Sequence, residues 1–173
     1  LFDKQVNENV FDRPSPYPLN EYLYVSGGDE TATQIVYLRK SLPLAKLTVS
    51  AASGTGKPGR LRKTPFGQTL LLENRGVGAS IETEIILFDN EKKIEFINRL
   101  HKEPSRNKEG VYFVFPFAVD RPAFDYEIQN GWVNPAHNML KGACLEWFTV
   151  QHWMKVSNPE IAIGLVPVDA PLV

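Results

Sequence analysis

The residues of this chain that are best suited to chemistry are tryptophans and polar side chains near its end. Sugars present apolar C–H faces that stack on indole rings, while their hydroxyl groups need fixed hydrogen-bond donors and acceptors. This mixture occurs in one region of the sequence, at Trp132, His137, Asn138, Trp147, Gln151 and Trp153. It predicts a carbohydrate-contacting surface. A second interpretation, which the sequence favours, is that the tryptophans seal the fold against a neighbouring domain.

The histidines and serines form no catalytic or metal-binding pattern. The histidines are His101, His137 and His152, and no two of them stand at metal-ligand spacing. A catalytic metal generally needs three protein ligands, and a catalytic serine needs a histidine base oriented by an acid. No Gly-x-Ser-x-Gly motif occurs. The sequence therefore predicts no catalytic residue and no metal site, and we interpret His152 as a structural histidine on the apolar face of its strand.

Two further features have simple structural explanations. Residues 53–59 resemble a phosphate-binding loop, but Pro58 follows Lys57 where that loop needs a serine or threonine. We interpret this stretch as a hairpin loop, and the basic residues 60–63 after it as a solvated edge. Cys144 is the only cysteine, so an internal disulfide is excluded, and its small apolar neighbours indicate a buried hydrophobic residue.

The elements that must position these side chains are strands. Aromatic and β-branched runs bounded by turn residues predict strands at residues 21–26, 34–39, 46–51, 68–74, 80–88, 93–101, 110–117, 123–129, 147–156 and 161–166. Residues 29–32 offer a short helix as an alternative, and residues 132–145 read as a long ordered loop. The run 110–117 is apolar on both alternating faces, which predicts a strand covered on both faces, as in the middle of a sandwich. Glu82 and Glu84 alternate with apolar residues and predict an exposed polar stripe.

This pattern predicts an all-β fold with little helix, an antiparallel β-sandwich, because strand follows strand without a helical crossover. Residues 1–13 read as an irregular lead-in, and residues 14–173 as one domain from a longer chain. The 173 residues are 43% hydrophobic and 23% charged, with a formal net charge of -1. That charge predicts neither nucleic acid nor an anionic membrane as a partner. The sequence leaves the cellular compartment open.

Four stretches together resemble a known family: residues 16–28, 81–89, 108–117 and 142–153. They are similar to the β-rich region that follows the catalytic domain in bacterial α-mannosidase-like proteins of glycoside hydrolase family 38. The resemblance runs from about Pro14 to the end of the chain, and residues 142–153 are its most specific part. It implies a galactose-mutarotase-like supersandwich.

The resemblance implies a function that is divided between domains. Family members hydrolyse α-mannosides with retention of configuration, using an aspartate nucleophile and a zinc ion held by histidines and aspartates. Those residues belong to an N-terminal α/β domain, and no position of this chain matches them. The resemblance therefore implies zinc only in the parent protein, and the chain by itself is predicted to be inactive.

The expected function is that of a non-catalytic β-sandwich domain of an α-mannosidase-like glycoside hydrolase. Its expected partners are the adjacent catalytic domain and, through the parent enzyme, a mannose-containing glycan whose pocket the domain lines. The alternative is an independent carbohydrate-binding module. A mutarotase-like epimerase fits the fold as a third possibility, but the sequence offers no identifiable acid and base for it.

Overall fold

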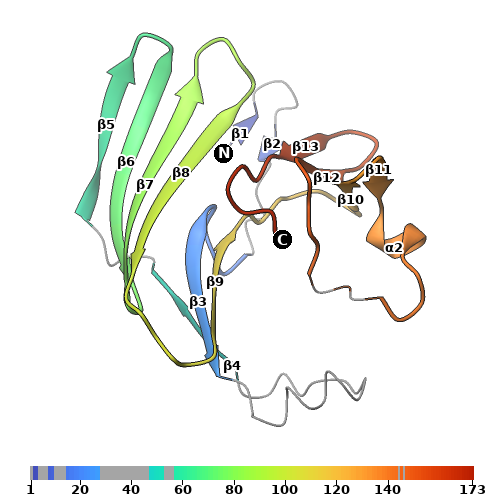
Figure 1. Cartoon of the computed structure of the whole chain (residues 1–173). Coiled ribbons are helices and arrows are strands. Elements are labelled where there is room, and N and C mark those ends of the chain that lie inside the picture. Colours follow the sequence, from blue (N-terminus) through green and yellow to red (C-terminus); the bar gives the residue numbers. More distant parts are fainter. Residues whose placement is uncertain are drawn as a thin grey trace. The chain divides into compact units, whose positions relative to one another are not determined.

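The computed structural model describes residues 2–3, 8–9, 15–27, 47–52, 57–143, 145 and 147–173. The chain divides into two compact units (Figure 1), residues 1–15 with 116–173 (unit 1) and residues 16–115 (unit 2). Within the described part every strand pair is antiparallel, and the four-residue α2 is the helix that it contains. The predicted all-β antiparallel fold is confirmed. One domain over residues 14–173 stays a prediction.

Unit 2 contains a four-stranded meander of long strands. Its strands, in spatial order, are β5 (Lys57–Thr64), β6 (Gly67–Gly76), β7 (Ala79–Phe88) and β8 (Ile94–Lys102). The two-residue turns Pro65–Phe66 and Val77–Gly78 join the first three strands, as alternating patterns interrupted by glycine predict. The strands predicted at 68–74, 80–88 and 93–101 are confirmed.

The edge strand β5 corrects one prediction. Residues 53–59 were expected to form a loop, but β5 already begins at Lys57, which pairs with Glu73 of β6. A bulge between Lys57 and Arg60 absorbs the irregular Pro58-Gly59 stretch, so that the pairing can start before it. Side chains 60–63 are all exposed, so the predicted solvated edge is confirmed.

A second sheet of unit 2 has the order β4 (Leu47–Ala51), β3 (Glu21–Gly27) and β9 (Glu109–Val114). The predicted cover on both faces of β9 agrees with the half-burial of all six of its residues, and among the described strands β9 lies at an edge of this sheet. The central strand is β3, in which Glu21–Tyr24 are buried. Apolar residues on both faces of β9 therefore indicated partial cover on each face, not a neighbour on each edge.

The two sheets of unit 2 pack face to face through an aromatic core. Tyr22 and Tyr24 of β3 pack with Ile81 of β7 and with Ala52, and partly buried Ala79, Val111 and Phe113 surround them. The Tyr22 ring meets Phe113 edge to face at a centroid distance of 5.9 Å. Full burial of one such side chain contributes about 1.5–3 kcal/mol to folding. Unit 2 is thus a small sandwich.

A polar contact also joins the segment before β3 to the meander. The amides of Asn20 and Asn98 exchange hydrogen bonds of 2.9 and 2.8 Å, and the Thr83 hydroxyl donates to Asn98 Oδ1 at 2.8 Å. Asn20 has a φ of 59°, a left-handed conformation that asparagine tolerates better than most residues. These buried polar groups are mutually satisfied, which fixes the entry of the chain into β3.

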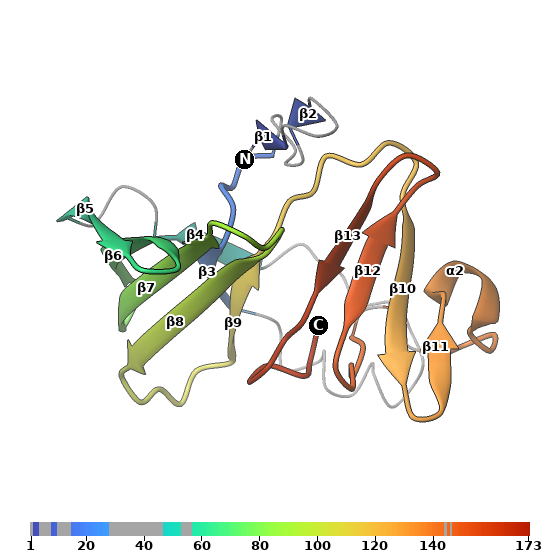
Figure 2. The same ribbon diagram turned by 90° about the horizontal axis from the view of Figure 1, so that it is seen from above.

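Unit 1 is built on a single four-stranded sheet, seen in Figure 2. Its spatial order is β11 (Gly131–Val133), β10 (Ala123–Ile128), β12 (Met154–Ser157) and β13 (Ala162–Leu165). The two-residue strands β1 (Phe2–Asp3) and β2 (Glu8–Asn9) form a separate pair. One face of the sheet packs into a core of Tyr126, Val150 and Met154, with Phe124, Val133, Phe148, Leu165 and Val173 against it.

The segment before β12 corrects the predicted strand at 147–156, since only Met154–Ser157 joins the sheet. Phe148 instead exchanges backbone hydrogen bonds of 2.7 and 2.9 Å with Val173, and Val150 donates to the Pro171 carbonyl at 2.7 Å. The backbone of Phe148 and Val150 therefore bonds to the last residues of the chain and not to the strands of the sheet. Phe148, Val150 and Met154 of this segment nevertheless pack into the core.

The predicted loop at residues 132–145 is also corrected at its start. The Asn130-Gly131 turn leads directly into β11, and α2 (Pro135–Asn138) follows. Asn134 caps α2 by accepting from Ala136 N at 3.0 Å, and Pro135 occupies the first helical turn. These are the residues favoured at helix starts, and they form one short turn of helix here.

Some predictions lie outside the described residues. They are the strand at 34–39, the alternative helix at 29–32, part of the loop at 53–56, and the burial of Cys144. Among the described residues, no helix is long and apolar enough to cross a membrane.

Candidate functional site

The best candidate site lies on the face of the unit 1 sheet that points away from its core. Along β10, Phe124 and Tyr126 face the core, so the alternating residues Asp125 and Glu127 take the opposite face. Trp132 of β11 is the direct partner of Glu127, and Lys155 of β12 is the direct partner of Asp125. We call this the polar face, defined by Asp125, Glu127, Trp132 and Lys155.

His152 joins the polar face through Glu127. Its Nδ1 lies 2.9 Å from Glu127 Oε2, and the exposed fractions of the two side chains are 67% and 25%. The predicted place of His152 on the apolar face is therefore wrong, although the ring has the hydrogen-bonding partner expected of a structural histidine. The backbone bends at Gln151 and His152, which breaks the alternation that would have turned the ring inward, and the carboxylate provides a partner at the surface.

Trp132 supplies the apolar surface of this site. It is 60% exposed although it sits within a strand. Beside it, Glu127 Oε1 and His152 Nε2 make no hydrogen bond to the described residues. The carboxylate oxygen can accept a hydrogen bond, and the imidazole nitrogen can donate or accept one, depending on protonation. An open indole next to these groups fits the apolar face and the hydroxyls of a sugar.

Asp125 occupies the centre of the polar face and is almost fully engaged. Its side chain is 9% exposed, and its Oδ2 lies 2.9 Å from Lys155 Nζ. Its Oδ1 accepts a 3.1 Å hydrogen bond from Asn134 Nδ2. A buried carboxylate needs such partners, because an unpaired charge would be costly there. Asp125 therefore organises the face and has little capacity left for a ligand.

The structure gathers three of the six predicted contact residues around Glu127. Trp132 pairs with Glu127 across β10 and β11, Gln151 N donates to the Glu127 carbonyl at 3.1 Å, and Glu127 N donates to the Trp153 carbonyl at 2.9 Å. His137 and Asn138 lie on α2, directly after β11. Trp147 lies in the irregular segment before β12 and takes no part in these hydrogen bonds.

Sequence reasoning missed three residues of this face, Asp125, Glu127 and Lys155, and also Asn134, which contacts Asp125. The signal for the first two was present, because residues 123–128 alternate strictly between apolar and acidic side chains from Phe124 onward. A half-exposed strand with both acids on one side follows from that pattern. Lys155 and Asn134 become visible only when the strand pairing is known.

Unit 2 carries a second polar cluster, at one end of its sandwich. Glu109 of β9 pairs with Lys102 of β8 and accepts a 2.7 Å hydrogen bond from the Tyr24 hydroxyl. The Lys102 ammonium, followed by the Tyr24 hydroxyl, holds the pKa of Glu109 below its ordinary value. The bond to Glu109 raises the pKa of Tyr24, and burial raises the pKa of Tyr22, whose hydroxyl has no hydrogen-bond partner among the described residues. A depressed carboxyl pKa suits a structural ion pair better than a base.

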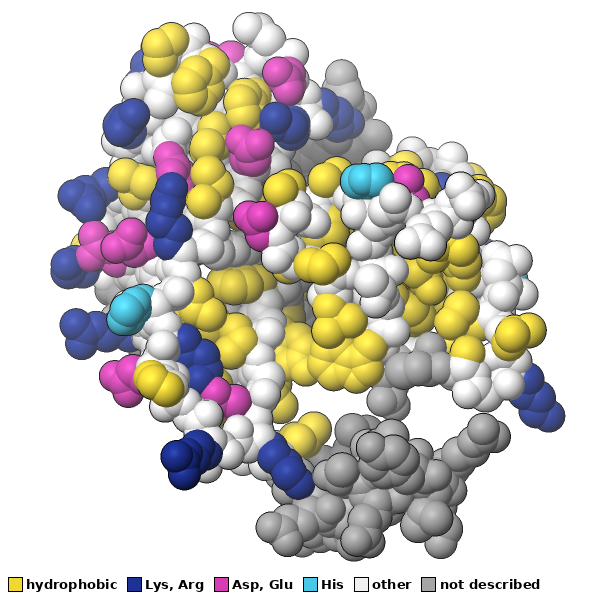
Figure 3. All heavy atoms as spheres, viewed as in Figure 1, with side chains coloured by type: hydrophobic (Ala, Val, Ile, Leu, Met, Phe, Trp, Pro, Cys, Tyr) yellow, Lys and Arg dark blue, Asp and Glu magenta, His cyan; other side chains and the backbone are white. Residues whose placement is uncertain are grey.

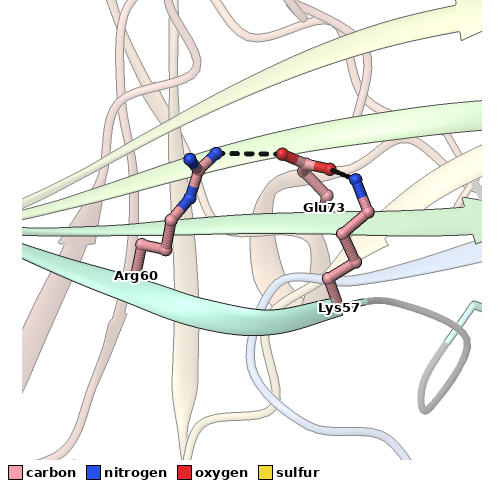
Figure 4. Close-up of polar contacts among 3 residues, drawn as sticks. All are labelled: Lys57, Arg60 and Glu73. Carbon is pink, nitrogen blue, oxygen red and sulfur yellow. Dashed lines mark hydrogen bonds and ion pairs between the residues drawn. The ribbon is translucent and has the colours of Figure 1, made fainter.

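The outer surface of the meander is a solvated, mixed-charge surface. Glu73 lies between two β5 cations, 2.8 Å from Lys57 Nζ and 3.0 Å from an Arg60 nitrogen (Figure 4). Lys57, followed by Arg60, lowers the pKa of the Glu73 carboxyl. Basic and acidic side chains are interspersed over β5–β8 in Figure 3. Glu82 is exposed and Glu84 pairs with Arg99 at 3.5 Å, so the predicted polar stripe is confirmed.

Among the described residues, no three histidine, cysteine, aspartate or glutamate side chains are placed to hold a metal ion. Comparison with known proteins adds no assignment: no protein-family model matches the chain, and neither a curated protein nor a solved structure is significantly similar to it. The resemblance to the mannosidase region stays a proposal.

Proposed function

We propose that this chain is a non-catalytic, saccharide-contacting β domain of an α-mannosidase-like glycoside hydrolase. One observation carries the saccharide contact: the exposed Trp132 indole stands opposite Glu127, whose carboxylate is held 2.9 Å from His152 Nδ1. The resemblance of residues 142–153 and the other three stretches supports the enzyme class, the supersandwich architecture and the mannose-containing glycan.

The chemistry of the polar face accounts for the ligand class. Trp132 provides a flat apolar surface for the C–H face of a pyranose ring. Glu127 Oε1 accepts from one hydroxyl, while His152 Nε2 bonds a neighbouring one. Because Glu127 and His152 hold each other, little side-chain freedom is lost on binding, which favours affinity.

In this proposal the domain holds saccharide-contacting side chains in fixed positions. Strands β10, β11 and β12 are hydrogen-bonded along their length, so they hold Trp132 and Glu127 in fixed register. Rigid strands place binding groups more reproducibly than loops do. The neighbouring catalytic domain supplies zinc and the nucleophile, and this chain contributes contacts to the same glycan.

An independent carbohydrate-binding module is the second candidate. It is favoured by the large exposed area of Trp132, since an indole open to solvent can stack on a sugar without help from another domain. The two candidates share one binding face and differ in whether the chain binds saccharide by itself.

The test is a titration of the chain with an α-linked mannotriose, followed by calorimetry. Trp132→Ala should weaken binding by about tenfold, because loss of the stacking partner removes on the order of 1.4 kcal/mol. The control is Phe66→Ala, which removes an exposed aromatic ring from unit 2. Saturable binding that depends on Trp132 supports the independent module.

The longer parent protein provides the test if the chain alone does not bind saccharide. If the chain alone does not bind, the proposal predicts α-mannosidase activity in the parent that falls when Trp132 is replaced by alanine, with KM rising more than kcat falls. Absence of binding together with an insensitive parent would overturn the saccharide contact. Interconversion of sugar anomers by the chain alone would instead favour the epimerase.

A further inference from the structure

Asn134 occupies a junction between the polar face and α2. Its Nδ2 donates to Asp125 Oδ1 at 3.1 Å, and its Oδ1 accepts from Ala136 N at 3.0 Å. Its backbone carbonyl accepts from His137 N at 3.1 Å and from Asn138 N at 2.8 Å. Both ends of one amide group are thus engaged, which fixes its orientation.

The other side of this junction is equally constrained. Asn134 N donates to Asn138 Oδ1 at 3.1 Å, so the last residue of α2 is hydrogen-bonded to the residue that caps its start. Asp125 is held by Lys155, so the chain of contacts runs from β12 through β10 to the end of β11 and into α2. A helix of four residues has too few internal hydrogen bonds to be stable alone, so its position depends on this anchor.

We infer that Asp125 and Asn134 form a brace that positions Trp132, His137 and Asn138 for saccharide. The inference rests on the proposed function and deepens it by assigning the positioning residues. Asn134 directly follows β11 and is two residues after Trp132, so we expect a shift of Asn134 to displace both the indole and α2. Asp125 and Asn134 act through these neighbours and do not contact the sugar.

The substitution Asn134→Asp isolates the brace. Aspartate caps a helix as well as asparagine does, so the acceptor for Ala136 N is retained. The donor to Asp125 is lost, and a second carboxylate faces the first. Adding Asp125→Asn restores the hydrogen bond with its direction reversed, because the amide at position 125 then donates to the carboxylate at position 134. The control is Asp120→Asn, which alters an exposed acid of the same unit whose carboxylate, among the described residues, pairs with the neighbouring Arg121.

Two measurements separate the brace from the proposed function. In the saccharide-free chain, NMR amide exchange at Ala136, His137 and Asn138 should rise about 2- to 12-fold in Asn134→Asp, the range expected for one lost hydrogen bond. Exchange at Lys155 and Val156 of β12 should stay unchanged. In the chain, or in the parent if only the parent binds, mannotriose affinity should fall by a similar factor, and the paired substitution should recover part of both losses.

The outcomes are distinct. Faster exchange in β12 as well as in α2 would mean general destabilisation and would overturn the positioning role. Unchanged exchange in α2 would overturn the brace itself. Unchanged affinity with faster α2 exchange would leave the brace without a part in binding, which also refutes the inference. If neither the wild-type chain nor its parent binds saccharide, the proposed function fails, while amide exchange still decides whether the brace exists.

Discussion

Gly76 gives the sharpest test of how the two sheets of unit 2 pack. A Cβ atom at this position would lie 2.8 Å from Cδ1 of the Tyr22 ring and closer still to Cε1. The ring cannot move aside easily, because Tyr22 is 3% exposed and meets Phe113 edge to face. Gly76→Ala must therefore overpack the core between the sheets.

The expected cost follows from two opposing effects. Overpacking costs about 1–3 kcal/mol, while replacing glycine restricts the unfolded chain and returns about 0.4–1 kcal/mol. We expect a net loss of roughly 1–2 kcal/mol in the free energy of unfolding. Urea unfolding followed by far-ultraviolet circular dichroism measures it, since all three tryptophans lie in unit 1 and do not report on unit 2.

A matched substitution and a double mutant complete this test. Gly164→Ala places a Cβ where no atom lies within 4 Å, so it should leave stability unchanged or slightly higher. In a Tyr22→Leu background the ring is absent, and Gly76→Ala should lose most of its cost. A fully tolerated Gly76→Ala, or the same cost in both backgrounds, would refute the packing of Tyr22 on Gly76.

Three further substitutions have definite outcomes. Tyr22→Phe should stabilise the chain by about 1 kcal/mol, because it removes a buried hydroxyl that has no partner in the described part of the chain; a loss of stability in urea unfolding would reveal a partner. Glu109→Gln should lower the thermal midpoint at neutral pH. Because the pKa of Glu109 is depressed in the folded state, its carboxylate stabilises the fold above the ordinary pKa of 4.5, and this stabilisation disappears as pH falls through the folded pKa. The thermal midpoints of the wild type and Glu109→Gln should therefore converge in acid. A difference between them that does not change with pH would contradict this. Met154→Ala should cost about 2–5 kcal/mol by tryptophan fluorescence, whereas Val168→Ala, at an exposed position, should be neutral.

Local patterns were sufficient to predict three strands of the meander, but they missed the edge strand β5, whose start was expected to be a loop. The strand composition of residues 68–74, 80–88 and 93–101, separated by short turn sequences, specifies strands that pair with their sequence neighbours. The same reasoning found the β10 strand and its Asn130-Gly131 turn. In these places the partner of each strand is the next strand, so little information from distant residues is needed.

Predictions failed where the partner is distant or where the chain bends. Phe148 and Val150 have strand composition, but their backbone pairs with Val173 and Pro171, which no local pattern indicates. His152 was assigned to the core by an alternation that the bend before β12 interrupts. The apolar pattern of β9 indicated cover on both faces but not its place at the edge of the sheet among the described strands.

The sequence predicted the kinds of side chain expected at the candidate site better than it predicted which residues form the site. Trp132 was predicted as a sugar contact from its chemistry, but its neighbour Glu127 was not, although the alternation of residues 123–128 placed Glu127 on the exposed face. The Asp125–Lys155 pair required the register of β10 against β12. Side-chain chemistry thus suggested the ligand class, and strand pairing supplied the polar groups.

The most direct test of the saccharide contact is the indole N–H region of the NMR spectrum during titration of the chain, or of the parent that contains it, with α-linked mannotriose. The three tryptophans give three signals, which single Trp→Phe substitutions assign. We predict a saturable shift of the Trp132 signal that is reduced in Glu127→Gln. A Trp132 signal that does not move at saturating mannotriose in either protein would contradict the proposed contact.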